Sequence, residues 1–83
     1  ANASTINDGA AAIVLTSAKH KSKAQFRILG FASHAQAPTW FTTAPIEAIK
    51  KNLKQCKLDI KQIDLFEINE AFAAVALANN IKL

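Results

Sequence analysis

The segment FEINEAFAAVALA, residues 66–78, decides how the fold is interpreted. Every residue from Ala71 to Ala78 is apolar, and a helix that is apolar on all sides is normally buried on all sides. The segment therefore predicts a buried helix over residues 69–80, preceded by the polar pair Asn69 and Glu70. Such a helix needs protein around it, and a chain of 83 residues has little to supply.

Three other segments have the composition of strands. Residues 10–17 (AAAIVLTS) form a continuous apolar run that suits a buried strand, although periodicity alone does not exclude a helix. Residues 25–35 alternate in part, and Gly30 within them indicates a bulge or a close backbone approach. Residues 63–67 (IDLFE) predict a third strand.

A second helix is predicted from Pro45, because proline favours the first helical position. Its apolar residues recur at helical spacing, and they are Ile46, Ile49, Leu53 and Cys56. The resulting order is strand, strand, helix, strand, helix. This order predicts an α/β fold with a helical crossover.

Composition excludes several protein classes. Net charge is +4, and 51% of residues are hydrophobic, which argues against disorder. The sequence lacks a basic stripe with interleaved aromatic residues, the pattern that would predict nucleic-acid binding. It also lacks an apolar run long enough to span a membrane. Cys56 is the single cysteine, so a reducing, cytoplasmic location is expected. The chain contains no methionine and ends in apolar residues, and both ends are expected to be cut.

The residues alone leave the chemistry open. Asn69 is either the N-cap of the buried helix or a polar group at the mouth of a buried site. Ser4 is either part of a turn or a hydroxyl that meets a ligand amide. Cys56 fits a structural role better than a nucleophilic one. His20 and His34 have no partner pattern, so no metal site is expected.

Three stretches resemble one family. NASTINDGAAAIVL (residues 2–15), WFTTAPIEAIKK (residues 40–51) and NEAFA (residues 69–73) resemble motifs of the thiolase family, in the same order. The motifs resemble most the acetyl-CoA acetyltransferase branch of this family. The chain is similar to about one fifth of a thiolase.

The resemblance implies a partial α/β/α/β/α layered fold. Residues 1–18 are expected to end the N-terminal half of a thiolase, residues 19–24 to form a basic connector, and residues 25–83 to begin the C-terminal domain.

The resemblance also implies roles for four residues. Asn69 matches the asparagine that holds a water in an oxyanion hole. Phe72 matches a residue of the acyl and pantetheine pocket, Ser4 matches a serine that contacts pantetheine, and Phe41 lies near an acyl-pocket position. The implied substrate is an acyl-coenzyme A thioester, with no metal and no covalently bound cofactor.

Three family features are missing from the chain. Thiolases use a nucleophilic cysteine, a histidine in a Gly-His-Pro setting and a second cysteine near the C-terminus. Cys56 matches neither cysteine, and His20 and His34 do not match the histidine. The chain alone is therefore expected to be inactive. The parent enzyme is expected to form a homo-oligomer. The alternative is a non-catalytic remnant or a split-protein subunit that pairs with a complementary thiolase fragment.

Overall fold

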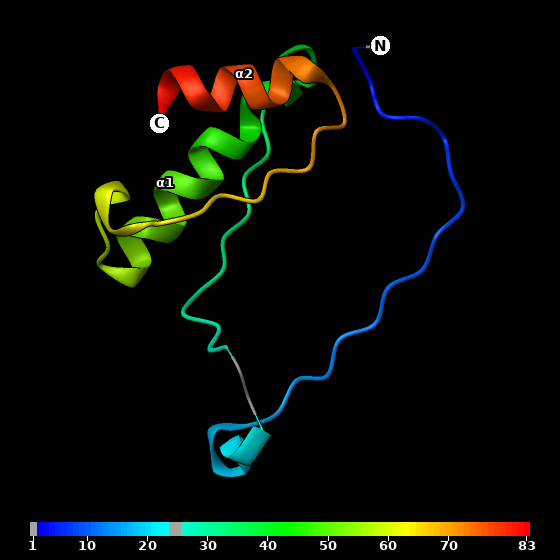
Figure 1. The fold of residues 1–83 in the computed structure, drawn as a ribbon. Coiled ribbons are helices and arrows are strands. Elements are labelled where there is room, and N and C mark those ends of the chain that lie inside the picture. Colours follow the sequence, from blue (N-terminus) through cyan, green and yellow to red (C-terminus); the bar gives the residue numbers. More distant parts are fainter. Residues whose placement is uncertain (1, 24–25) are drawn as a thin grey trace.

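The computed structural model describes residues 2–23 and 26–83, and two α-helices dominate it (Figure 1). The helix α1 spans Ala44–Cys56, and α2 spans Ala73–Lys82. Three short 3-10 helices accompany them, η1 (Ala18–Lys23), η2 (Pro38–Thr43) and η3 (Ile60–Gln62). Residues 24 and 25, where the predicted basic connector ends and the second predicted strand begins, lie outside the described residues.

The helix α1 forms where the sequence predicts it. Pro45 lies in its first turn, and Glu47 places a carboxylate near the positive end of the helix dipole. Its apolar stripe faces inward, with Ile46 only 5% exposed. The helix ends at Cys56, and the next residue, Lys57, is its C-cap in the left-handed conformation with φ 56°. The prediction of a helix beginning at Pro45 is confirmed within one residue.

The predicted strand–strand–helix–strand–helix order and α/β class are wrong for this structure. Among the described residues, the only bridge between extended segments is an isolated antiparallel one between Ala3 and Phe72. The described residues of the three segments predicted as strands have no ladder partner. Val14, Phe31 and Leu65, one from each segment, are 91%, 88% and 75% exposed. An apolar pattern marks a side-chain face, but a strand also needs a neighbouring backbone to bond with.

The chain is open rather than compact. The radius of gyration is 15.4 Å, whereas a compact chain of this length has about 12 Å. Figure 1 shows why: the segment that leads from the N-terminus towards η1 follows a long arc away from the two helices. The packed part of the described chain is therefore the junction of η2, α1 and α2.

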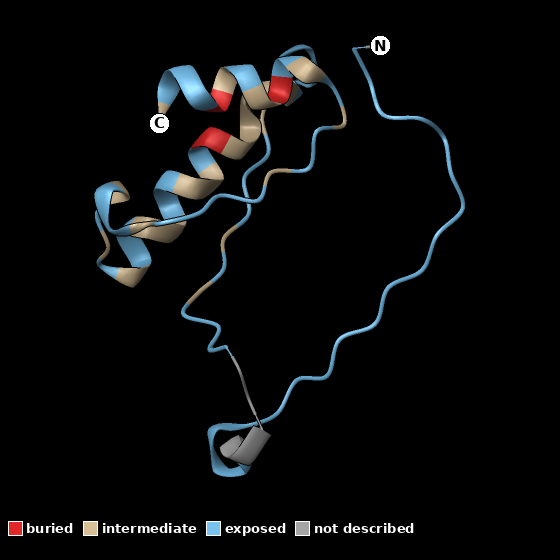
Figure 2. Ribbon diagram, viewed as in Figure 1, coloured by how far each residue is buried: buried red, intermediate tan, exposed pale blue. Residues whose placement is uncertain are grey.

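The helix α2 differs from its prediction in two ways. It begins at Ala73 rather than at Asn69, and its N-cap is Phe72, whose side chain makes no capping bond. The N-cap interpretation of Asn69 is therefore wrong. The helix is also not covered on all sides, because Leu77 and Ile81 are 59% and 76% exposed. Figure 2 shows its buried residues on the side that faces α1.

Gly30 lies against α1, so the structure has the close backbone approach that was one of the two alternatives for this residue. A Cβ atom at residue 30 would lie 2.5 Å from Cys56 Sγ and 2.9 Å from Asn52 Oδ1. Both distances are below van der Waals contact. The glycine is therefore required for space, and it allows the extended segment to approach the helix closely.

We expect Gly30→Ala to reduce the free energy of unfolding by about 1–3 kcal/mol, because the added methyl overpacks this contact. Gly9→Ala is the matched control, since a Cβ at Gly9 would meet nothing within 4 Å. Urea unfolding measures both, and Cys56→Ala in the Gly30→Ala background should restore part of the loss. Equal effects of the two glycine substitutions would contradict the close approach.

Candidate functional site

A cavity of about 430 Å³ lies at the junction of η2, α1, α2 and the segment before α2. Most of its lining is apolar, and Glu67 and Asn69 are the two residues with polar side chains. The full lining is Phe41, Pro45, Ala48, Ile49, Glu67, Ile68, Asn69, Ala71 and Val75. A mostly apolar cavity with few polar groups is the usual form of a small-molecule site.

Two aromatic rings meet beside this cavity. Phe41 comes from η2 and Phe72 from the N-cap position of α2, and their ring centroids are 5.8 Å apart at an interplanar angle of 73°. This edge-to-face arrangement is favourable for aromatic pairs. Both rings remain partly accessible, at 53% and 43% exposed. They therefore present an apolar surface next to Asn69.

The N-terminal segment reaches the same place through backbone hydrogen bonds. The Ser4 N–H donates to the Ala71 carbonyl at 3.1 Å, and the Ala73 N–H donates to the Asn2 carbonyl at 3.0 Å. The second bond satisfies the first N–H of α2, which a helix cannot satisfy internally. Ser4 is thereby fixed next to the segment that carries Asn69 and Phe72.

The four residues singled out from the sequence therefore come from three distant segments and converge here. Asn69 and Phe41 line one cavity, Phe72 packs on Phe41, and Ser4 pairs with the backbone beside Phe72. Their individual roles stay predictions. Glu67 and Val75 also line the cavity but are not among the residues that the sequence predicts for the site, although helical spacing on α2 would have suggested Val75 as a wall.

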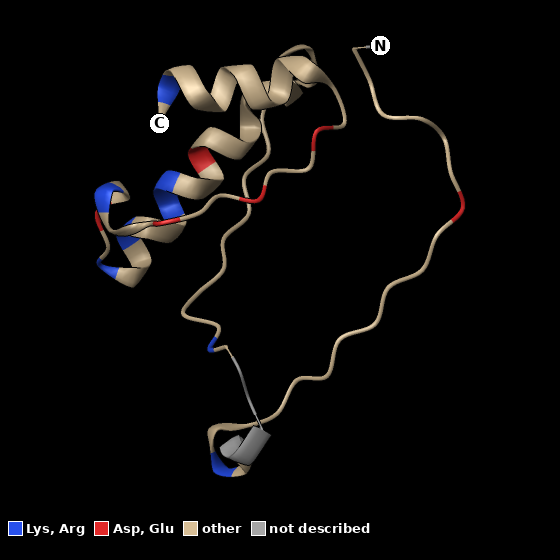
Figure 3. Cartoon of the chain, in the orientation of Figure 1, with Lys and Arg blue, Asp and Glu red and all other residues tan. Residues whose placement is uncertain are grey.

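The charges are unevenly distributed around the site. Figure 3 shows basic residues gathered along α1 and η3, and acidic residues along the segment that leads to α2. The one ion pair in the described residues joins Lys50 Nζ and Glu47 Oε1 at 3.4 Å, and both side chains are about half exposed. An exposed pair of this kind contributes little stability.

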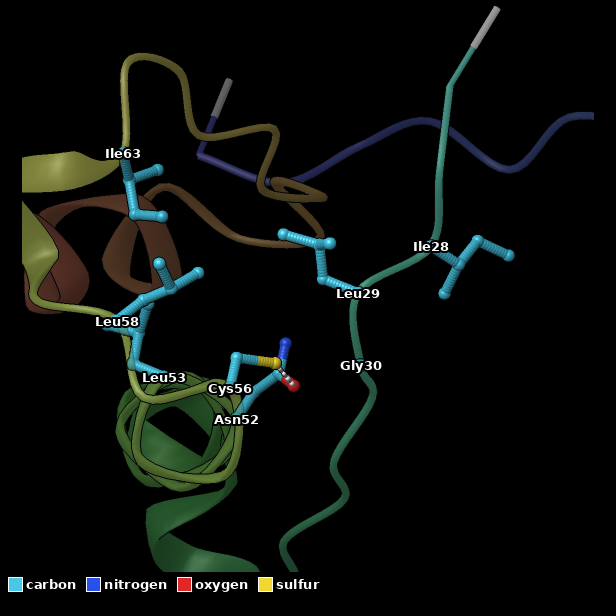
Figure 4. Close-up of a pocket in the computed structure, with 8 residues that line it drawn as sticks. All are labelled: Ile28, Leu29, Gly30, Asn52, Leu53, Cys56, Leu58 and Ile63. Carbon is cyan, nitrogen blue, oxygen red and sulfur yellow. Dashed lines mark hydrogen bonds between the residues drawn. The ribbon is translucent and has the colours of Figure 1, made fainter. Parts of the chain in front are cut away.

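Cys56 lies in a different place. It lines a second cavity of about 210 Å³, with Leu53, Leu58 and Ile63 among its apolar neighbours (Figure 4). Its thiol donates to Asn52 Oδ1 at 3.6 Å. His34 pairs with Gln36. Neither residue lines the Asn69 cavity, which agrees with a structural interpretation of Cys56.

The described residues offer neither a metal-binding cluster nor a membrane-spanning helix. Residues 2–23 and 26–83 contain no group of three or more metal-ligating side chains. In the same ranges, no helix has the length and apolar character needed to cross a bilayer.

The thiolase C-terminal domain family matches residues 20–83. The chain belongs to the thiolase family. Three of its relatives are named acetyl-CoA acetyltransferases. The Schizosaccharomyces pombe enzyme is 52% identical over 83 residues, which is 95% of this chain and 21% of the relative. Acetyl-CoA acetyltransferase 1 of Arabidopsis thaliana is 50% identical over 82 residues, 94% of this chain and 20% of the relative. A cytosolic acetyl-CoA acetyltransferase of Gibberella zeae is 51% identical over 82 residues, again 94% of this chain and 21% of the relative.

This thiolase chain thus spans about one fifth of the length of the relatives it matches. No solved structure matches it significantly. The family motifs at Asn2–Leu15 and Asn69–Ala73 are the two segments that the backbone pairing joins in the structure.

We expect Ser4→Pro to release the N-terminal segment from α2, because proline removes the N–H that bonds to Ala71. Amide hydrogen exchange at Ala73 should then accelerate at least about tenfold, since its partner Asn2 is no longer held in place. Ile6→Pro is the control, because Ile6 is fully exposed and its N–H makes no hydrogen bond to another backbone group of residues 2–23 or 26–83. Unchanged exchange at Ala73 in Ser4→Pro would show that the pairing does not persist in solution.

Proposed function

We propose that this chain supplies the oxyanion-hole region of an acetyl-CoA C-acetyltransferase, an enzyme that condenses acyl-CoA or cleaves it by thiolysis. The observation that carries the proposal is that Asn69 and Phe41 line one cavity, while Phe72 packs on Phe41 and Ser4 bonds to the backbone beside Phe72. Membership of the thiolase family supports the same function.

Asn69 is the central residue of this proposal. Its side-chain amide offers two N–H donors and one acceptor, which suits it to hold a water. That water donates to the thioester oxygen as negative charge develops there during carbon–carbon bond formation. Asn69 is exposed in these 83 residues, so we propose that the rest of the parent enzyme excludes the bulk water that would otherwise weaken such a bond.

The other three residues bind the substrate. The rings of Phe41 and Phe72 form the wall against which the acyl group and the start of the pantetheine arm lie. Ser4 contacts the pantetheine arm, whose amides match the donor and acceptor of a hydroxyl. The substrate is an acyl-CoA, and no covalently bound cofactor takes part.

The nucleophile and the base come from residues outside these 83. An acyl-enzyme requires an activated thiol beside a base. Cys56 lies in the second cavity with its thiol bonded to Asn52, away from the Asn69 cavity. We therefore propose that the 83 residues alone do not catalyse the reaction.

The setting of the enzyme is proposed by analogy with its relatives. We propose that the parent enzyme is a homo-oligomer in the cytoplasm, in line with the relative described as cytosolic. The division into residues 1–18, 19–24 and 25–83 stays a prediction.

A chimera tests the role of Asn69. The 83 matched residues of the Schizosaccharomyces pombe relative are replaced by this chain, and acetoacetyl-CoA thiolysis is measured. We expect the chimera to be active. Asn69→Ala in it should lower kcat by about 10²–10³-fold with KM nearly unchanged, because the lost interaction is made mainly in the transition state.

Asn80→Ala is the matched control, since Asn80 is an exposed asparagine on α2 outside the cavity. Its activity should equal that of the parent chimera. An Asn69→Ala variant within about twofold of the parent rate would contradict a transition-state role for this residue.

The exposed apolar residues favour a second candidate function, a non-catalytic remnant or split-protein subunit that pairs with a complementary thiolase fragment. Ile13, Phe26 and Phe31 are each more than 80% exposed, and such surface tends to mark an interaction site.

Pairing would change how the chain melts. The purified chain should melt without a sharp transition, and adding a complementary thiolase fragment should produce one cooperative transition at 1:1 stoichiometry. A sharp transition for the chain alone, unaltered by the fragment, would contradict this second function.

A further inference from the structure

Trp40 is exposed, yet its backbone is firmly held. Its side chain is 64% exposed. The Trp40 N–H donates to the Ala37 carbonyl at 2.8 Å. Its carbonyl accepts from Gln36 Nε2 and, at 2.9 Å, from Thr43 Oγ1.

The same side chains bond to one another. Gln36 Nε2 donates to Thr43 Oγ1 at 2.6 Å, and His34 Nε2 lies 3.2 Å from Gln36 Oε1. These bonds hold the turn at Trp40, where the backbone leaves helical geometry with φ −110° and ψ 16°. Much of the conformational entropy of this turn is therefore already lost before any ligand binds, which is the physical content of preorganisation.

This combination separates Trp40 from the two most exposed aromatic residues. Phe26 and Phe31 are 89% and 88% exposed, and they lie on an extended segment outside any helix. Trp40 instead directly precedes Phe41, which lines the Asn69 cavity and packs on Phe72. A large apolar side chain is thus presented on a fixed turn beside the proposed acyl site.

We propose that Trp40 contacts the pantetheine arm of a bound coenzyme A thioester, an inference that rests on the function proposed above. Pantetheine is attached to the thioester sulfur. It therefore leaves the cavity past the residues that hold the acyl group. Its gem-dimethyl group offers apolar surface to the indole ring, and its amide carbonyls are acceptors for the indole N–H.

The chain provides its own reporter for this contact, because Trp40 is its single tryptophan and it contains no tyrosine. The chain is titrated with coenzyme A, with pantetheine and with adenosine 3′,5′-bisphosphate. Tryptophan emission and calorimetric heat are recorded in parallel. Coenzyme A and pantetheine should both bind and shift the emission to shorter wavelengths as the indole leaves water. The nucleotide alone should not shift it.

Variants separate a contact from a structural effect. Trp40→Ala should weaken pantetheine binding about tenfold, as loss of a buried aromatic contact does. Gln36→Leu keeps the indole but breaks the network, and should weaken binding about threefold through lost preorganisation. Phe31→Ala removes another exposed aromatic ring that does not line the cavity, and binding should be unchanged.

The outcomes distinguish this inference from the proposed function. Pantetheine binding heat without an emission change, or with unchanged affinity in Trp40→Ala, would overturn the role of Trp40 and leave the function standing. Absence of heat with all three ligands would count against the function and the inference together.

Discussion

A short backbone pairing between residues 2–4 and 71–73 is the contact on which the site depends. It consists of two hydrogen bonds, Ser4 N–H to the Ala71 carbonyl at 3.1 Å and Ala73 N–H to the Asn2 carbonyl at 3.0 Å. The second bond supplies the acceptor that the α2 N-terminus lacks, because its N-cap is an apolar phenylalanine. The first bond fixes Ser4 beside Phe72. One local pairing thus completes a helix terminus and brings the two family motifs together.

The rest of the site is built by helix packing. The apolar stripe of α1 contributes Ile49 to the cavity and Ile46 to the small core. Val75 on α2 closes the opposite side, and η2 adds Phe41. Asn79, one turn after Val75, is fully buried and donates from Nδ2 to the Val75 carbonyl at 2.7 Å. A helix junction therefore positions the walls, and the segment before α2 adds the polar groups Glu67 and Asn69.

The sequence predicted the parts that local chemistry determines. Pro45 and the stripe that follows it predicted α1, and of the two alternatives for Gly30, a bulge or a close approach, the structure has the close approach. The roles of the motif residues stay predictions. The strands were wrong because alternation identifies an apolar face but does not name a backbone partner, and residues 10–17, the described residues of the 25–35 segment and 63–67 have none in this structure. The start of α2 was wrong because its first N–H is satisfied by Asn2, a residue about seventy positions away that no local pattern connects to it.

The most direct test of this account is the scalar coupling across the hydrogen bond between the Ser4 amide nitrogen and the Ala71 carbonyl carbon, measured by NMR on the isotope-labelled chain. The account predicts a resolved coupling for this pair and for Ala73 with Asn2, comparable to those within α1. Detection of the α1 couplings without either of these two would mean that the N-terminal motif does not reach α2, and the convergence of Ser4, Phe72 and Asn69 would be contradicted.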